Sequence, residues 1–107
     1  MKVVRWDASA QRFAADKLQK VPLFASERFF CDLYCLEPGQ SQKIHAHAGS
    51  DKVYLVAEGE GLFSIGGEER RLGSGEATFA PANAPHGVAN DSNARLVVLT
   101  FMAPPPA

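Results

Sequence analysis

The chain has 107 residues and a formal net charge of −1, with 46% hydrophobic and 21% charged residues. That length supports one domain with one hydrophobic core and is too short for two. The sequence has no basic run to hold a phosphate backbone, and its apolar runs fall well short of the ~20 residues that span a bilayer. We therefore expect neither a nucleic-acid partner nor a membrane.

The first seven residues contain no apolar run behind a basic start, which predicts a cytoplasmic protein without a secretory signal.

Cys31 and Cys35 are the only cysteines, and they fall four positions apart in a predicted strand. At ~3.3 Å per residue they would lie about 13 Å apart. A disulfide needs Cα atoms within roughly 7 Å, so we expect both thiols to pack as small hydrophobic side chains.

The predicted elements are one short helix followed by strands. Residues 13–20 carry a short apolar face, which predicts a helix of about two turns that Pro22 ends. Gly66 and Gly67 predict a two-residue hairpin, because paired glycines accept the positive φ of the turns that join such strands. The predicted strands cover residues 27–36, 42–47, 52–57, 61–65, 68–72, 76–81, 87–90 and 95–102.

These segments predict an all-β protein of roughly eight or nine strands. A small domain of this kind must close or curl its sheet to avoid long free edges, which favours a jelly-roll β-barrel. We divide the chain into an N-terminal strand or helix arm (1–24), the barrel (25–102) and a proline-rich tail (103–107). We expect the tail to be an exposed end, since its prolines lack the backbone donors that a sheet needs.

All three histidines fall in two short motifs, His45-Ala46-His47 and Pro85-His86-Gly87. Alternate residues of a strand face the same side, so His45 and His47 should project together. His86 from a neighbouring strand can complete the group. Neutral imidazole is the commonest transition-metal ligand, and three of them leave coordination positions open for water or a substrate.

The residues around the histidines form two spaced patterns that resemble those of the cupins. The first pattern has Gly39, five residues, His45-Ala46-His47, four residues, Lys52, six residues and Gly59. The second has Gly75, Pro81, Asn83, His86 and Asn90. The chain departs from the family in two places, with Lys52 where cupins have glutamate and Asn83 where they have glycine. The resemblance covers residues 25–102 and implies the barrel fold, also called the double-stranded β-helix.

In metal-containing cupins the motif histidines and the glutamate bind one metal, so the resemblance implies that His45, His47 and His86 are ligands. The metal would be a divalent transition ion such as Fe, Mn, Ni, Cu or Zn. An ammonium has no lone pair to donate, so Lys52 leaves three arrangements open. Lys52 turns away or pairs with Asp51 or Glu58, or Asp51 becomes a ligand, or the site holds no metal and Lys52 recognises an anion.

Two further side chains are pocket candidates. Tyr54 shares strand parity with Lys52, and Tyr34 is the second aromatic candidate. Asn83 tolerates a left-handed backbone, so the turn should survive, and Asn90 should stabilise a turn. The sequence leaves open an enzyme with a three-histidine metal site acting on a small molecule, a metal-free protein that binds a small, anionic molecule, and a structural or accessory dimer. The resemblance also implies a homodimer.

Overall fold

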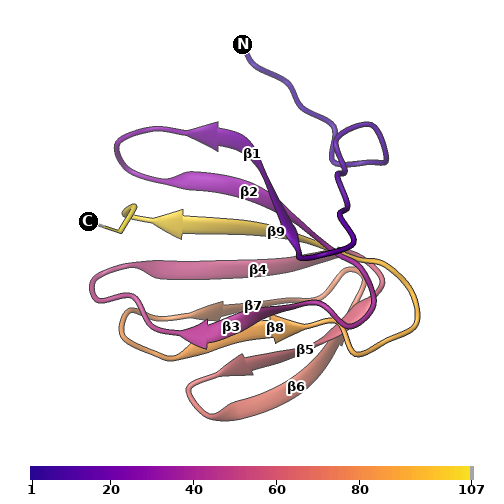
Figure 1. Ribbon diagram of the computed structural model, residues 1–107. Coiled ribbons are helices and arrows are strands. Elements are labelled where there is room, and N and C mark those ends of the chain that lie inside the picture. The colour runs from indigo at the N-terminus through magenta and orange to yellow at the C-terminus, as the bar shows by residue number, and fades with distance from the viewer. Residues whose placement is uncertain (107) are drawn as a thin grey trace.

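The computed structural model describes residues 1–106, which form nine β-strands and no helix (Figure 1). The strands are β1 (Gln19–Ala25), β2 (Phe30–Leu36), β3 (Ser41–His45), β4 (Asp51–Glu58), β5 (Glu60–Ile65), β6 (Glu68–Gly73), β7 (Ala77–Ala80), β8 (His86–Ala89) and β9 (Leu96–Ala103). Ala107, the last residue of the predicted tail, lies outside the described residues. The described part of the chain contains no helix long and apolar enough to cross a membrane.

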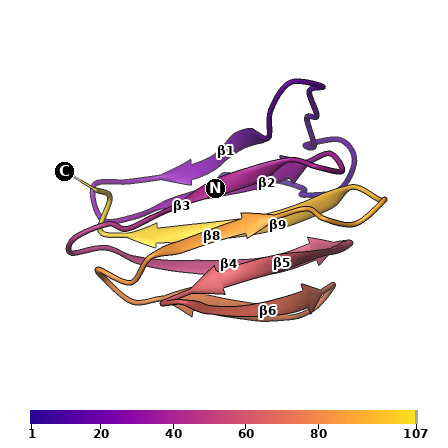
Figure 2. The same cartoon turned by 60° about the horizontal axis from the view of Figure 1, so that its bottom comes forward.

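The strands form two antiparallel sheets that face each other (Figures 1 and 2). One sheet has the order β1-β2-β9-β4-β7, and the other has the order β3-β8-β5-β6. Neighbours within a sheet are mostly distant in the sequence, as a jelly roll requires. The predicted all-β jelly-roll fold is confirmed.

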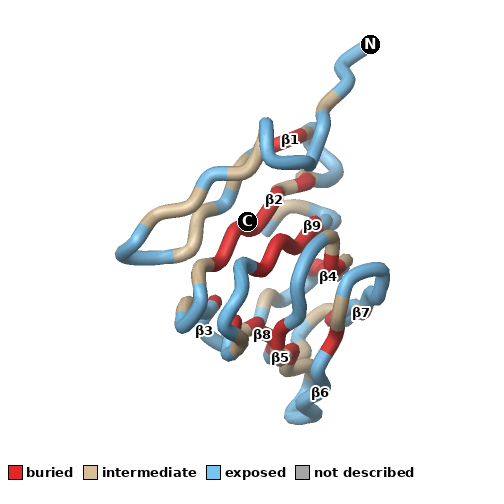
Figure 3. The backbone as a smooth tube through the Cα atoms, turned by 90° about the vertical axis from the view of Figure 1, so that its right-hand side faces the viewer, coloured by how far each residue is buried: buried red, intermediate tan, exposed pale blue. Residues whose placement is uncertain are grey.

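The main core fills the space between the two sheets. Its buried members come from both sheets: Tyr34, Leu36, Tyr54, Val56, Phe63, Leu72, Val88, Leu96 and Val98. Alternation along β4 explains the arrangement, because Lys52, Tyr54 and Val56 are buried while Val53 is partly exposed. Figure 3 shows buried backbone concentrated in β2, β9 and β4, the middle of the larger sheet.

A second apolar cluster covers the outer face of the larger sheet. It contains Leu23, Cys31, Leu33, Cys35, Val97 and Leu99, with Val4, Ala10 and Phe13 of the N-terminal segment packed against it. The two cysteines are buried and free, as the strand spacing predicts. β2 and the first half of β9 are therefore covered on both faces, which explains their nearly continuous apolar sequence.

The predicted helix over residues 13–20 is wrong. Residues 15–17 form a bend, and β1 begins at Gln19, whose register partner is Cys35 on β2. A helix of about two turns is marginal without tertiary support. Here the Arg95 guanidinium lies 4.2 Å from the centre of the Phe13 ring, and pairing with β2 uses the backbone that the helix would need.

The turn between β5 and β6 has the structure that the sequence predicts. Gly66 and Gly67 adopt positive φ values of 59° and 88° and join β5 to β6 with Ile65 opposite Glu68. The glycine pair is thus confirmed as a two-residue hairpin loop.

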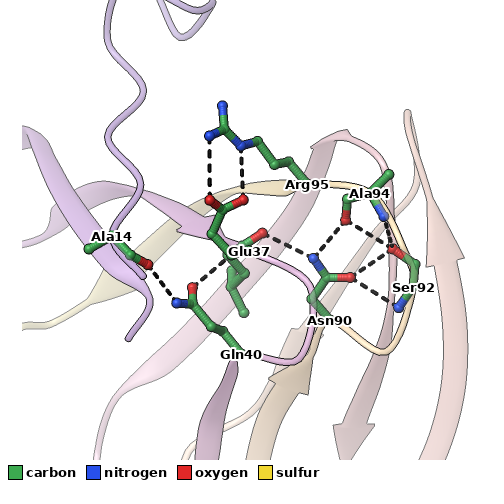
Figure 4. A network of polar contacts seen from close by, with 8 residues as sticks. Ala14, Glu37, Gln40, Asn90, Ser92, Ala94 and Arg95 are labelled. Carbon is green, nitrogen blue, oxygen red and sulfur yellow. Dashed lines mark hydrogen bonds and ion pairs between the residues drawn. The ribbon is translucent and has the colours of Figure 1, made fainter. Parts of the chain in front are cut away.

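Asn90 ties together the loop between β8 and β9 (Figure 4). Its Nδ2 donates to the carbonyl oxygens of Leu36 and Ala94, and its Oδ1 accepts from the backbone N–H and hydroxyl of Ser92. The predicted turn-stabilising role is confirmed. In the same region the Gln40 side chain donates to the carbonyl of Ala14 and so fixes the arm to the barrel.

Candidate functional site

The three histidines lie together where β3 pairs with β8. His45 ends β3 and is the direct partner of His86, the first residue of β8. His47 follows just beyond the end of β3. Ligand nitrogens of all three side chains lie within 4.8 Å of one another. The prediction that a neighbouring strand brings His86 to the pair is therefore confirmed.

Backbone carbonyl groups orient two of the imidazole rings. Nδ1 of His45 lies 2.7 Å from the carbonyl oxygen of Lys43, and Nδ1 of His86 lies 2.9 Å from that of Ala84. A carbonyl oxygen only accepts hydrogen bonds, so we assign the proton of each ring to Nδ1. Each neutral ring then keeps a lone pair on Nε2, which is the state that binds a metal.

The Nε2 atoms of this group fit a metal ion. Nε2 of His86 is the one buried side-chain nitrogen or oxygen in residues 1–106 without a hydrogen-bond partner. Nε2 of His45 and Nε2 of His47 lie 2.9 Å apart, at hydrogen-bond distance, so without a metal Nε2 of His47 donates a proton to Nε2 of His45. Burial lowers the pKa of His86 and of His47, so both rings favour the neutral form that donates a lone pair. A divalent transition metal would satisfy the buried nitrogen, whose isolation otherwise costs free energy.

A turn beside the site holds His47 in place. The backbone N–H of Asn83 donates to the carbonyl oxygen of His47 at 2.9 Å. Asn83 has a φ of 73°, so the left-handed turn survives with asparagine in place of glycine, as expected.

Lys52 lies inside the barrel and is only 2% exposed. Its Nζ donates to the hydroxyl oxygen of Tyr34 at 2.7 Å. The alternative in which Lys52 turns away from the site or pairs with Asp51 or Glu58 is therefore wrong. Burial lowers the pKa of Lys52 to about 7, because desolvation disfavours the charged form.

Tyr34, Gln42 and Tyr54 form a buried polar chain with Lys52. The Gln42 amide donates to the Tyr34 hydroxyl at 3.1 Å and accepts from the Tyr54 hydroxyl at 2.6 Å. Burial raises the pKa of Tyr34 to about 12 and also raises that of Tyr54, so both stay neutral. Tyr34 thus bonds Lys52 directly and lines the adjoining cavity, whereas Tyr54 does not line it and is connected to it only through Gln42.

Sequence reasoning missed Gln42. In a regular strand, residues 42 and 45 point to opposite faces. A register irregularity between Gln42 and His45 lets both face the interior and leaves Ile44 57% exposed. The only feature of Gln42 in the sequence is that it is a polar residue at the start of a predicted strand. That feature by itself indicates no site.

A cavity of about 240 Å³ opens beside the histidines. Its lining residues are Lys20, Phe30, Asp32, Tyr34, Gln42, His45, His47, Lys52, Met102 and Pro106. Asp51 is not brought to the histidines, because its exposed carboxylate accepts the backbone N–H of Ala82 at 2.8 Å. Lys20 was not singled out from the sequence, since β1 was not predicted as a strand, and Asp32 was not singled out although it lies in the predicted strand 27–36.

Comparison with known proteins identifies the family. A family profile described as "Cupin domain" matches residues 32–102. The chain belongs to the cupins. The TT1209 protein from Thermus thermophilus has the same fold, with a TM-score of 0.96 and 47% identity over 99% of this chain and 100% of that one. An RmlC-like cupin from Desulfovibrio desulfuricans has a TM-score of 0.85 and 27% identity over 98% and 99% of the two chains.

Among curated relatives, this cupin is 29% identical to the Oxalate-binding protein of Thermotoga maritima over 88 residues, which are 82% of this chain and 72% of that protein. An uncharacterized protein of Methanocaldococcus jannaschii is 30% identical over 67 residues, 63% of this chain. The match spans only 54% of that protein's length.

In this cupin, Lys52 occupies the position of the usual glutamate and points inward at the same cavity as His45 and His47.

Proposed function

We propose that this cupin holds a divalent transition metal on His45, His47 and His86 and acts on a small molecule in the adjoining cavity. The observation that supports the proposal is the convergence of three ligand nitrogens within 4.8 Å, including the buried, unpartnered Nε2 of His86. A metal bound there would supply a Lewis acid with open coordination positions. Iron, manganese, nickel, copper and zinc all accept imidazole ligands.

The chain's own residues would bind and orient the small molecule. Tyr34 and Lys52 present polar atoms to the cavity, while Phe30 and Met102 supply an apolar wall. Tyr54 acts indirectly. Its hydroxyl donates to the Gln42 amide oxygen and so orients the amide group that donates to Tyr34. We propose the cytoplasm as the working compartment, because Cys31 and Cys35 are free thiols, as is usual in reducing compartments.

Elemental analysis of protein purified without chelator or affinity tag tests the metal site. We expect near-stoichiometric metal in the parent, and at least about a tenfold loss of metal affinity in His86→Ala, because one of three ligands is removed. Asp51→Asn is the matched control and should keep its metal, since that carboxylate bonds Ala82 instead. A parent that stays metal-free after metal is supplied would contradict the proposal.

A second candidate is a metal-free protein that binds an anion. The buried ammonium of Lys52 at the usual glutamate position supports it, because a divalent cation and an ammonium repel each other. The relative named an oxalate-binding protein supports an anionic ligand in either case. Elemental analysis separates the two candidates.

We further propose a homodimer that buries the outer face of the larger sheet. Val53 pairs with Phe79 on one side and Phe101 on the other, and these partly exposed residues form an apolar row across β7, β4 and β9. The N-terminal segment covers the neighbouring part of this face. A face of this kind can pair with its own copy about a two-fold axis.

Light scattering after size exclusion tests the dimer. We expect the parent to be dimeric and the double variant Phe79→Ser, Phe101→Ser to be monomeric, because the two substitutions remove both aromatic side chains of this apolar row. Ile44→Ser is the control, since Ile44 is 57% exposed on the other sheet. A monomeric parent, or a double variant that stays dimeric, would contradict this interface.

A further inference from the structure

Lys52 is a buried amine whose protonated form has hydrogen-bond donors to spare. An ammonium carries three N–H donors, yet among residues 1–106 its Nζ has a single acceptor, the hydroxyl oxygen of Tyr34. None of the ion pairs in the described chain includes Lys52. The faces of Tyr34 and Tyr54 lie 4.9 and 5.2 Å from Nζ and supply weak attraction. A buried charge with so few partners is costly unless a counter-ion joins it.

The cavity walls carry more positive than negative charge. When Lys52 is protonated, Lys20 and Lys52 face one acidic residue, Asp32, so the lining carries a net positive charge even with neutral histidines. Nζ of Lys20 lies 5.2 Å from the centre of the Tyr34 ring. Burial also raises the pKa of Asp32, which weakens it as a counter-ion. A metal on the histidines would increase the positive charge further.

The apolar part of the lining favours an organic anion over an inorganic one. Phe30 and Met102 line the same cavity of about 240 Å³ that Lys52 and Tyr34 reach. Phosphate or sulfate has no apolar part to contact these side chains, whereas a small carboxylic acid combines an oxyanion with a carbon skeleton.

We propose that the cavity binds a small organic carboxylate, whose oxygens accept the spare N–H groups of Lys52 while its carbon skeleton lies on Phe30 and Met102. The inference deepens the proposed function by naming the ligand class of the same site. Lys52 recognises the carboxylate through charge-assisted hydrogen bonds, which need no metal. The metal, where present, adds a second positive centre on the opposite wall.

Calorimetric titration of the full chain with malonate tests this inference, with metal-loaded and chelator-treated protein measured separately. We expect the parent to bind malonate and Lys52→Met to bind it at least about tenfold more weakly, both after chelator treatment and at saturating metal. Lys17→Met removes the same charge from an exposed position and should match the parent. Malonamide, which is similar in size but neutral, should bind the parent at least about tenfold more weakly than malonate.

Three outcomes would overturn the inference. These are no malonate binding by the parent, equal binding of malonate and malonamide, and equal malonate binding by a folded Lys52→Met variant and the parent. The malonamide comparison needs no variant, so it decides even where Lys52→Met fails to fold. If a protein that takes up no metal binds malonate through Lys52, this inference holds and the metal proposal fails. If the protein takes up metal but does not bind malonate, the metal proposal holds and this inference fails.

Discussion

Lys52→Glu is expected to raise the affinity for a divalent transition metal about a hundredfold, or roughly 3 kcal/mol. The substitution removes an ammonium that repels the ion and places a carboxylate on the inward face of β4, beside the cavity that His45 and His47 line. Three imidazoles and one carboxylate then form the ligand set of the family's metal-binding members. Competition against a chelating indicator with Zn²⁺ or Ni²⁺ measures the change.

Lys52→Gln separates the two causes of that gain. Glutamine removes the positive charge without supplying a carboxylate, so it should recover only part of the hundredfold increase. Equal affinities for Lys52→Glu and Lys52→Gln would show that the carboxylate does not reach the metal, which would count against a ligand position at residue 52.

Gly59→Ala is expected to lower the free energy of unfolding by about 3 kcal/mol or more, and the melting temperature by roughly 12–24 °C. Gly59 has a φ of 80°, and a Cβ at this position would overlap the backbone carbonyl oxygen of Arg95. That carbonyl belongs to the segment just before β9, so neither the turn nor the sheet can move away easily. Thermal unfolding followed by circular dichroism measures the loss.

Gly39→Ala is the matched control for Gly59→Ala. Gly39 has a similar φ of 87°, but a Cβ there would meet nothing within 4 Å. Its cost should be about 1 kcal/mol, from the backbone conformation alone. Similar losses in the two variants would mean that the contact with Arg95 contributes little.

The strands and the His45 and His47 pair were predictable from short-range rules, and the resemblance to cupins supplied the barrel that brings His86 to them. Turn glycines divide the strands, and an antiparallel partner can place His86 opposite His45. Gly66 and Gly67 determine their hairpin in the same way.

The rest of the site depends on irregularities and long-range packing. Strict alternation would point Gln42 and His45 to opposite faces of the strand, but the irregularity between them turns both inward. Neither strand parity nor residue spacing could therefore place the Gln42 amide between two tyrosines. The hydrogen bond from Lys52 to Tyr34 joins β4 to β2, which are not neighbours in the sheet. β1 went unrecognised because Pro22 suggested the end of a helix, whereas Pro22 lies in an edge strand, where proline is tolerated.

The position of β9 affects the order in which the barrel assembles. β9 is the last strand in the chain, yet it pairs with β2 on one side and β4 on the other at the centre of the larger sheet. A growing polypeptide can form the local β5–β6 hairpin early, but the apolar strands β2 and β4 lack their shared partner until β9 has been synthesised. Until then both strands present unpaired, hydrophobic edges, so the nascent chain passes through a stage prone to aggregation before the sheet closes late.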